Sequence, residues 1–306
     1  MNILYPFLAV SAGLLFAVQG PVNSNLGRRT NTFFATSVSF LGGLIFIIIL
    51  CALDGFGTIG NISQAKLWML LGGLYGAFGV CVSVTSIPVL GVALTLMANM
   101  FGQLITGCVL DRFGWMGVDR TPVTPLRIVG IAAVALGIYL IFLDKRKNSA
   151  PGASDSAKRL PMLLLAFSCG ITGGMQSPTN AALSALIGSL EGTLISFLTG
   201  FIAIAIITLF VCRGKMPALK GKNIEPWMYS GGLYGVAAIF LNTISVGVLG
   251  AALLTAGSTL GQLLGGVIID STGFIQSEKV KISTMRLSGV AAVALGVVLV
   301  TIAKLH

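Results

Sequence analysis

Charged residues are scarce in this chain. Of its 306 residues, 9% are Asp, Glu, Lys or Arg, whereas a soluble domain carries roughly 25%. A soluble fold of this length could not cover its surface with so few charges. Hydrophobic residues make up 55% of the chain. The composition therefore indicates an integral membrane protein.

Patterns that bind metals or form disulfides are also missing. The chain has a single histidine, His306, and its five cysteines form no Cys-x-x-Cys pair. These cysteines lie in or beside apolar runs, where a free cysteine packs as a small hydrophobe. We therefore expect no metal site, no disulfide framework and no cofactor. No Ser/His/Asp set or pair of carboxylates lies inside an apolar run, so we do not expect an enzyme.

The net charge of +10 does not indicate a nucleic-acid partner. The basic residues lie in short loops between apolar runs, which is typical of membrane topology and not of a nucleic-acid groove. The bilayer and a small-molecule substrate are the expected partners. The oligomeric state stays open, with a homodimer as one arrangement.

Ten apolar runs are long enough to cross about 30 Å of hydrocarbon as helices. Because no basic residue precedes the first run, we expect it to be kept and not cleaved as a signal peptide. The expected spans are 4–26, 33–53, 67–86, 89–110, 127–143, 160–187, 192–212, 227–246, 248–269 and 286–303.

One charged segment divides these spans into five and five. It covers 144–159 and is rich in Ser, Ala, Pro and Gly, as linkers are. We therefore predict a first five-helix repeat over 1–143, a linker over 144–159 and a second five-helix repeat over 160–306.

The two halves are similar in sequence. "WMLLGGLYG" (68–76) and "WMYSGGLYG" (227–235) agree at seven of nine positions, and "GQLITGCVLDRFG" matches "GQLLGGVIIDSTG" at the same offset. "SFLGG" (39–43) likewise returns as "SFLTG" (196–200). Such self-similarity indicates duplication. Five spans per copy make the second copy enter the membrane from the opposite side. Inverted repeats of this kind are typical of secondary transporters, whose binding site lies near the membrane midplane.

The distribution of basic residues predicts the orientation. The side that holds both termini carries five Lys or Arg residues, and the other side carries fourteen. The positive-inside rule then places the linker in the cytoplasm and both termini outside. We expect a multi-pass protein of the bacterial cytoplasmic (inner) membrane.

The pattern Gln-x-Pro-x-Asn occurs twice inside apolar spans. Its Gln and Asn are four residues apart, so they share a helix face. Its Pro removes a backbone N–H donor and leaves a carbonyl free. We expect these groups to face one cavity, where they would bind a polar solute. The copies are Gln19, Pro21 and Asn23 in the first half and Gln176, Pro178 and Asn180 in the second.

Further polar side chains are expected to contribute to the same substrate site. They are Asn99, Gln103, Gln262, Tyr75 and Tyr234. For Gln103 and Gln262, bonding between helices is an equally good interpretation, because amides also hold membrane helices together. Ser24 and Asn25 have alanine counterparts in the second copy, so we expect the first half to offer the more polar wall.

No charged residue lies well inside an expected span. Proton relays through membranes normally use buried carboxylates, so such a relay at the midplane is not expected. If protons couple to transport, Asp111 and Asp270 are the candidates, because they end equivalent spans in the two halves.

These features resemble the drug/metabolite transporter superfamily. The motifs "QGPVNSNLG" with "QSPTNAALS", the repeated "GGLYG", and the Gly-Gln…Asp-x-x-Gly pair resemble its YdcZ-like branch, transporter family-2, in the fused two-repeat form. The resemblance implies an all-α membrane protein of ten helices in two inverted halves that moves small molecules. The related small multidrug resistance proteins carry a glutamate in the first helix, where this chain has Gln19 or Asn23.

The sequence therefore predicts a secondary transporter, an exporter or facilitator of a small polar metabolite or drug-like solute, working by alternating access. A passive pore is an alternative, although no ring of charges is available to line it. A membrane partner protein that transports nothing is the other alternative.

Overall fold

The computed structural model describes residues 4–57, 59–118, 120–147, 156–213, 223–277, 279–280 and 283–305. All regular elements among these residues are helices, which confirms the all-α fold class. The long helices are α1 (Leu4–Arg29), α2 (Thr32–Asp54), α3 (Gly72–Leu90), α4 (Val92–Phe113), α5 (Pro125–Lys147), α6 (Ser156–Ile187), α7 (Ser189–Val211), α8 (Gly231–Thr272) and α9 (Thr284–Leu305). The 3-10 helices are η1 (Ile59–Gln64), η2 (Leu67–Leu71), η3 (Trp115–Gly117), η4 (Pro226–Tyr229) and η5 (Phe274–Gln276).

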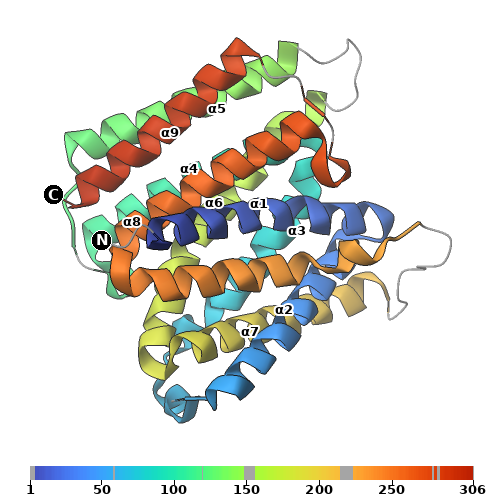
Figure 1. Cartoon of the computed structure of the whole chain (residues 1–306), viewed down its shortest axis with the longest axis vertical. Helices are drawn as coiled ribbons and strands as arrows, with labels where there is room; N and C mark the ends of the chain where they lie inside the picture. The colour runs from blue at the N-terminus through green and yellow to red at the C-terminus, as the bar shows by residue number, and fades with distance from the viewer. Residues whose placement is uncertain are drawn as a thin grey trace.

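Eight helices in the described part of the chain are long and apolar enough to cross a membrane. Helix α8 holds the two remaining expected spans, 227–246 and 248–269, in one helical run of 42 residues, except for the first residues of 227–246, which lie in η4 and the turn after it. Figure 1 shows that this run turns back on itself near the chain termini, which gives it a first limb (231–242) and a second limb (254–272).

The contacts along α1 show the reversal of α8. Gln19 and, one turn later, Asn23 face Gly235 and Gly231, so the first limb is antiparallel to α1. The second limb is parallel to α1 because its contacts advance in the same direction along both helices. These contacts are Ala9 with Gly257, Gly13 with Gly261, and Ala17 with Gly265.

The helices are longer than the sequence predicts on both sides of the expected linker. α5 continues to Lys147 and α6 begins at Ser156, so the described ends of the segment 144–159 are helical. Residues 148–155 of that segment lie outside the described residues. The first turn of the third expected span is the 3-10 helix η2 instead of an α-helix.

Close helix contacts occur in equivalent pairs in the two halves. A methyl group on Gly13 would clash with the Ser258 carbonyl oxygen, and one on Gly170 would clash with the carbonyl oxygen of Asn99. Helix α1 therefore packs on α8 as α6 packs on α3 and α4. Each half inserts its first helix against the later helices of the other half, so the two halves interlock.

Helices α5 and α9 form a pair of their own at one edge of the molecule (Figure 1). They approach closely where Gly130 meets Gly296 and where Gly137 meets Gly289. Small residues at such positions let two membrane helices pack through their backbones.

The two ends of the helix bundle differ in the segments they hold. Both chain termini lie at one end, here called the terminal end (Figure 1). Lys147 and Ser156, which flank the undescribed part of the expected linker, lie at the other, here called the linker end. Large apolar side chains such as Leu53 and Phe210 are exposed on the outer surface, as helices in contact with lipid require.

Candidate functional site

A cavity of about 400 Å³ lies between the two halves. Its walls come from α1, α2, α3 and α4 of the first half and from α6, α7 and α8 of the second. Small-molecule sites usually measure about 300–1,000 Å³ and lie between structural units. The cavity is therefore the candidate substrate site.

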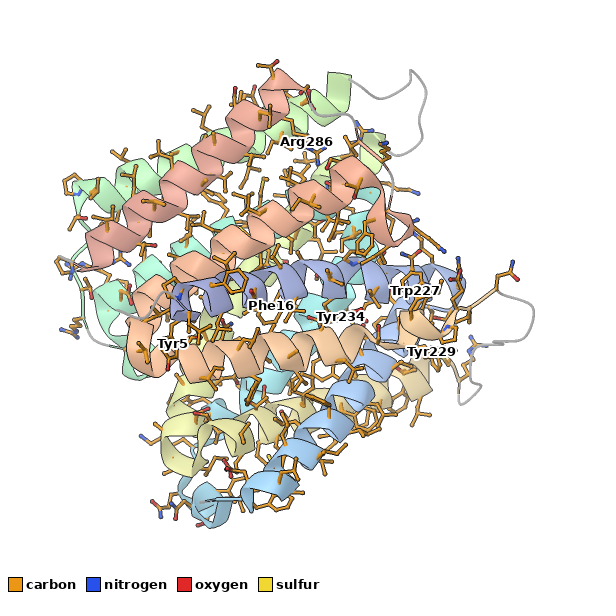
Figure 2. All side chains as sticks on the ribbon, viewed as in Figure 1. Tyr5, Phe16, Trp227, Tyr229, Tyr234 and Arg286 are labelled. Carbon is orange, nitrogen blue, oxygen red and sulfur yellow. The ribbon has the colours of Figure 1, made fainter. Side chains whose placement is uncertain are left out.

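Most of the polar residues expected at a substrate site line this cavity. Tyr234 is the exception, because it does not line the cavity. Figure 2 shows Tyr234 near the middle of the molecule, together with Phe16 of α1, which lines the cavity. The expected residues that the cavity brings together are Gln19, Asn23, Tyr75, Asn99, Gln103, Gln176, Asn180 and Gln262.

The Gln and Asn of α1 lie in a cradle of glycines on α8. A methyl group on Gly231 would clash with Asn23 Oδ1, and one on Gly235 would lie 2.6 Å from Gln19 Nε2. Only a residue without a side chain leaves this room. The glycines of "GGLYG" at 231–235 thus make the room in which the Gln and Asn of the first Gln-x-Pro-x-Asn motif lie.

The second motif is held in the same way by α3. A methyl group on Gly72 would clash with Asn180 Oδ1, and one on Gly76 would lie 2.7 Å from Gln176 Nε2. Each Gln-x-Pro-x-Asn motif therefore lies against the "GGLYG" of the opposite half. Two motifs that are far apart in sequence form one structural unit, and this unit occurs twice.

The middle glycine of each "GGLYG" brings two further helices together. Methyl groups on Gly73 and Gly232 would clash with the carbonyl oxygens of Ser196 and Ser39. Contacts this close hold α3 against α7 and α8 against α2. They place both serines on the cavity wall.

Two phenyl rings lie beside these serines on the cavity wall. The Phe40 and Phe197 rings are 5.3 Å apart between centroids and tilted by 45°. Each ring fills the space that a glycine of the facing helix leaves, Gly200 for Phe40 and Gly43 for Phe197. The repeated "SFLGG" and "SFLTG" thus build this wall, which the sequence signalled as a repeat but which was not predicted as part of the site.

Two of the amides are fixed by hydrogen bonds on the cavity wall. Asn23 Nδ2 donates to Ser39 Oγ at 3.1 Å, and Gln103 Nε2 donates to Asn99 Oδ1 at 3.1 Å. The Oδ1 atoms of Asn180 and Asn242 are buried and accept no hydrogen bond from any described residue. Buried polar atoms normally have partners, so these two residues mark the part of the wall that is least satisfied.

Asn242 was missed at the sequence level. Its counterpart in the first half is Ser83, so the repeat gave no signal for an amide at this position. Thr255, whose counterpart is Leu96, also lines the cavity. At both positions the second half offers the more polar side chain.

The expectation of a more polar wall from Ser24 and Asn25 is wrong for this cavity. Neither residue lines it, because both turn toward the backbone of neighbouring segments. Ser24 Oγ donates to the Val84 carbonyl oxygen at 3.3 Å. Asn25 Nδ2 donates to the carbonyl oxygens of Pro21 at 3.0 Å and Ile275 at 2.7 Å.

The two prolines lie within continuous helices and outside the cavity wall. Pro21 is inside α1 and Pro178 is inside α6. Because proline has no N–H, the helix bonds to the Ala17 and Gly174 carbonyl groups are missing. None of these four residues is among the described residues that line the cavity.

Asp111 and Asp270 are buried in ion pairs away from the cavity wall. Asp111 Oδ2 lies 2.5 Å from Arg127 NH2, and Asp270 Oδ2 lies 2.6 Å from Arg286 NH2. Figure 2 shows Arg286 between α9 and the second limb of α8. The equivalent pairs join the end of each half's fourth span to the start of its fifth.

Asp270 has a second structural role. Its Oδ1 accepts a hydrogen bond from the Val92 backbone N–H at 2.8 Å, and its Oδ2 accepts one from Ala93 at 3.0 Å. These N–H groups begin α4, where a helix has unpaired donors and favours negative charge. The carboxylate thus caps a helix of the other half while it pairs with Arg286.

A polar network closes the linker end of the bundle, and we call its residues Arg29, Glu225, Trp227 and Gln276 the linker-end network. Arg29 NH2 donates to Gln276 Oε1 at 2.8 Å. The Gln276 amide donates to Glu225 Oε1 at 3.0 Å, and the Trp227 indole donates to Glu225 Oε2 at 2.7 Å. The Trp227 and Gln276 hydrogen bonds, with the charge of Arg29, lower the pKa of the Glu225 carboxyl below its ordinary value.

Among the residues that the structure describes, the terminal end shows no counterpart of this network. The equivalents of Arg29, Glu225 and Gln276 are Leu186, Lys66 and Gly117. An apolar cluster of Leu183, Ile187 and Ile195 packs with side chains of η1 and η2 at this end. The linker end has a matching apolar cluster of Leu26, Ala35 and Met228. The halves are thus alike around the cavity, and the linker end differs by the polar network that it adds.

Comparison with known proteins shows the family to which the chain belongs. A family model described as "Putative inner membrane exporter, YdcZ" matches residues 4–140 and again 161–299. The chain belongs to the YdcZ family. Its members are described as inner-membrane exporters, so this protein is a multi-pass inner-membrane protein of a transporter family and not of an enzyme family.

A curated member of the YdcZ family gives the scale of one repeat. The "Inner membrane protein YdcZ" of Escherichia coli (strain K12) is 29% identical over 140 residues, which are 90% of that protein and 43% of this chain. A solved structure titled "Crystal structure of protein" has a TM-score of 0.63 at 16% identity and covers 100% of both chains. That likeness concerns the fold alone, and it covers both repeats.

Proposed function

We propose that this YdcZ-family protein moves a small polar solute across the inner membrane by alternating access, with the cavity between the halves as the substrate site. The observation that carries the proposal is the seating of each Gln-x-Pro-x-Asn motif in the glycine cradle of the other half. A solute bound by both motifs touches both halves. A rocking movement of one half against the other then changes which end of the cavity is open.

The repeat boundaries, 1–143 and 160–306, are part of this proposal. So is the orientation, with both termini outside, which rests on the distribution of basic residues. Asp111 and Asp270 already pair with arginines in the described state. Coupling to protons at either carboxylate would therefore require the ion pair to open, and we do not include it in the proposal.

The test is transport by the purified protein in liposomes, with a panel of labelled small polar solutes. We expect saturable uptake and counterflow of at least one solute. Gln176→Ala and Gln19→Ala should each reduce its flux about tenfold, because one or two hydrogen bonds of about 1 kcal/mol are lost. Gln64→Ala is the matched control, because Gln64 is exposed in η1 and far from the cavity.

Three outcomes would contradict the proposal. Normal flux in both cavity variants would place the site elsewhere. Single-channel currents without counterflow would mean a passive pore. Absence of any flux, together with stable capture of a second membrane protein, would mean a partner protein that transports nothing.

A further inference from the structure

The cavity is polar without being charged. None of the described residues on its wall is Asp, Glu, Lys, Arg or His. The helices that build the wall carry their charged residues only near their ends, and no charged residue occurs over 4–27, 32–53, 67–110, 160–190, 192–212 or 226–269. Eight carboxamides line the wall instead: Gln19, Asn23, Asn99, Gln103, Gln176, Asn180, Asn242 and Gln262.

Two pairs of buried charges compensate each other, and the buried Glu191 at the start of α7 does not line the cavity. Asp111 pairs with Arg127 and Asp270 pairs with Arg286, and none of the four residues lines the cavity. They offer no counter-charge to a solute in the cavity.

An ion is a poor ligand for such a cavity. A charge moved from water into a low-dielectric site without a partner of opposite charge loses several kcal/mol of hydration that carboxamides recover only in part. A hydroxyl or amide group, in contrast, can exchange its water for a carboxamide at little net cost. The wall also carries Phe16, Phe40 and Phe197, which suit an apolar face of a ligand.

We propose that the transported solute is uncharged and carries hydroxyl or amide groups beside an apolar face. This inference rests on the proposed function, since it assigns a substrate class to the same cavity. The chemistry fits a neutral polyol, sugar, nucleoside or carboxamide better than an amino acid, an organic cation or a carboxylate.

The two halves give such a solute a preferred direction. Phe16 of the first half corresponds to Gly173 in the second, so at this wall position only the first half offers an aromatic side chain. Asn242 and Thr255 of the second half correspond to Ser83 and Leu96. We expect polar groups of the solute to find added partners at Asn242 and Thr255 of α8, and its apolar face to lie against the Phe16 ring.

The test compares solutes that share a skeleton and differ in charge. One set is nicotinamide, nicotinate and 1-methylnicotinamide, and another is glucose, gluconate and glucosamine. Binding is measured on the purified full-length protein as a rise in the unfolding midpoint with solute concentration. We expect an uncharged member to bind at least tenfold more tightly than the charged members of its own set.

A charge introduced in the wall should change this preference. Asn242→Asp keeps the shape of the side chain and adds one carboxylate, so the cationic member of a set should gain at least tenfold in affinity relative to the uncharged one. Asn61→Asp is the matched control, because Asn61 is exposed in η1 and does not line the cavity. The wild-type comparison decides the proposal even if Asn242→Asp does not fold.

The inference is overturned if a charged member binds as tightly as its uncharged relative, or if no uncharged solute of either set stabilises the protein. Its failure is distinct from failure of the proposed function. Saturable transport of a charged solute in liposomes would leave the proposed function standing and remove this inference. Absence of transport for every solute would count against both.

Discussion

At the scale of single residues, the decisive feature is the glycine that makes room for an amide. Asn23 and Asn180 lie on Gly231 and Gly72 so closely that a methyl group would clash with their side-chain oxygen atoms. The repeated "GGLYG" is therefore more than a surface for helix packing. Packing alone explains the middle glycines, which meet backbone, whereas the outer glycines position the polar side chains of the cavity.

Gly231→Ala should destabilise the protein and disturb the cavity. The added methyl group pushes Asn23 from its place and breaks its hydrogen bond to Ser39. Overpacking of this kind costs about 1–3 kcal/mol of unfolding free energy. Denaturant or thermal unfolding in detergent measures the loss.

Gly107→Ala is the control for this substitution. Gly107 lies inside α4, and a methyl group there would meet nothing within 4 Å. Its unfolding free energy should stay unchanged or rise by up to about 1 kcal/mol through better helix propensity. Asn23→Ala combined with Gly231→Ala should restore part of the loss. If Gly231→Ala and Gly107→Ala change the unfolding free energy equally, the glycine cradle does not hold Asn23 in place.

At the scale of elements, both ends of the bundle hold an apolar cluster, and the linker end adds a polar network. The linker-end network ties the end of α1 to the segments before η4 and after α8 through polar groups. The terminal end is closed by apolar side chains of α6 and α7 against η1 and η2. Polar contacts depend on ionisation and apolar contacts do not, so the two closures should respond differently to pH.

The contribution of Glu225 to stability should disappear in acid. Because its carboxyl pKa is lowered in the folded protein, the contribution is present above the ordinary carboxyl pKa and is lost as the pH falls through the lowered value. The wild type should thus unfold at a higher temperature than Glu225→Gln at about pH 7, and the gap should narrow as the pH falls below the ordinary carboxyl pKa of about 4.3. Intrinsic tryptophan fluorescence follows the unfolding midpoint.

Asp54→Asn provides the reference for this experiment. Asp54 ends α2 at the terminal end and is exposed, with no described hydrogen bond from its side chain. This variant should follow the wild-type midpoint at every pH. A gap between the wild type and Glu225→Gln that stays constant from neutral pH to acid would mean that the carboxylate charge of Glu225 adds nothing to the network.

At the scale of the whole molecule, the interlocked halves explain how so apolar a chain can hold a polar cavity. Each half places its first helix between the later helices of the other, so polar groups of both halves face inward while apolar side chains face lipid. Glycine contacts join α5 to α9 at one edge of the molecule. Neither helix contributes a described residue to the cavity wall, which the other helices build. Figure 1 shows the pair α5 and α9 at this edge.

The proposed orientation can be tested on whole cells. Alkaline phosphatase, which folds only outside the cytoplasm, should be active when it is fused after His306, and a fluorescent protein that folds only in the cytoplasm should be dark there. A fusion in the segment 148–155 should give the reverse pattern. If alkaline phosphatase is inactive after His306 and active in the segment 148–155, both termini lie in the cytoplasm. That result would contradict the prediction from the basic residues.

The sequence by itself determined the class of the protein and most of the site. Scarce charge and long apolar runs leave only helices in a membrane, since the backbone must satisfy its own hydrogen bonds there. The repeated Gln-x-Pro-x-Asn motif also identified Gln19, Asn23, Gln176 and Asn180 as a group, because polar side chains are costly in apolar spans unless they have a task.

Only the tertiary structure decided which residues meet. Periodicity places Asn23 on a helix face, but it does not say that this face lies on Gly231 of the other half. Asn242 could not be predicted, because its repeat partner is a serine. Asp270 was predicted only as the end of a span, and its pairing with Arg286 and capping of α4 depend on contacts between segments far apart in the chain. Such contacts are set by how the halves pack, which no local pattern encodes.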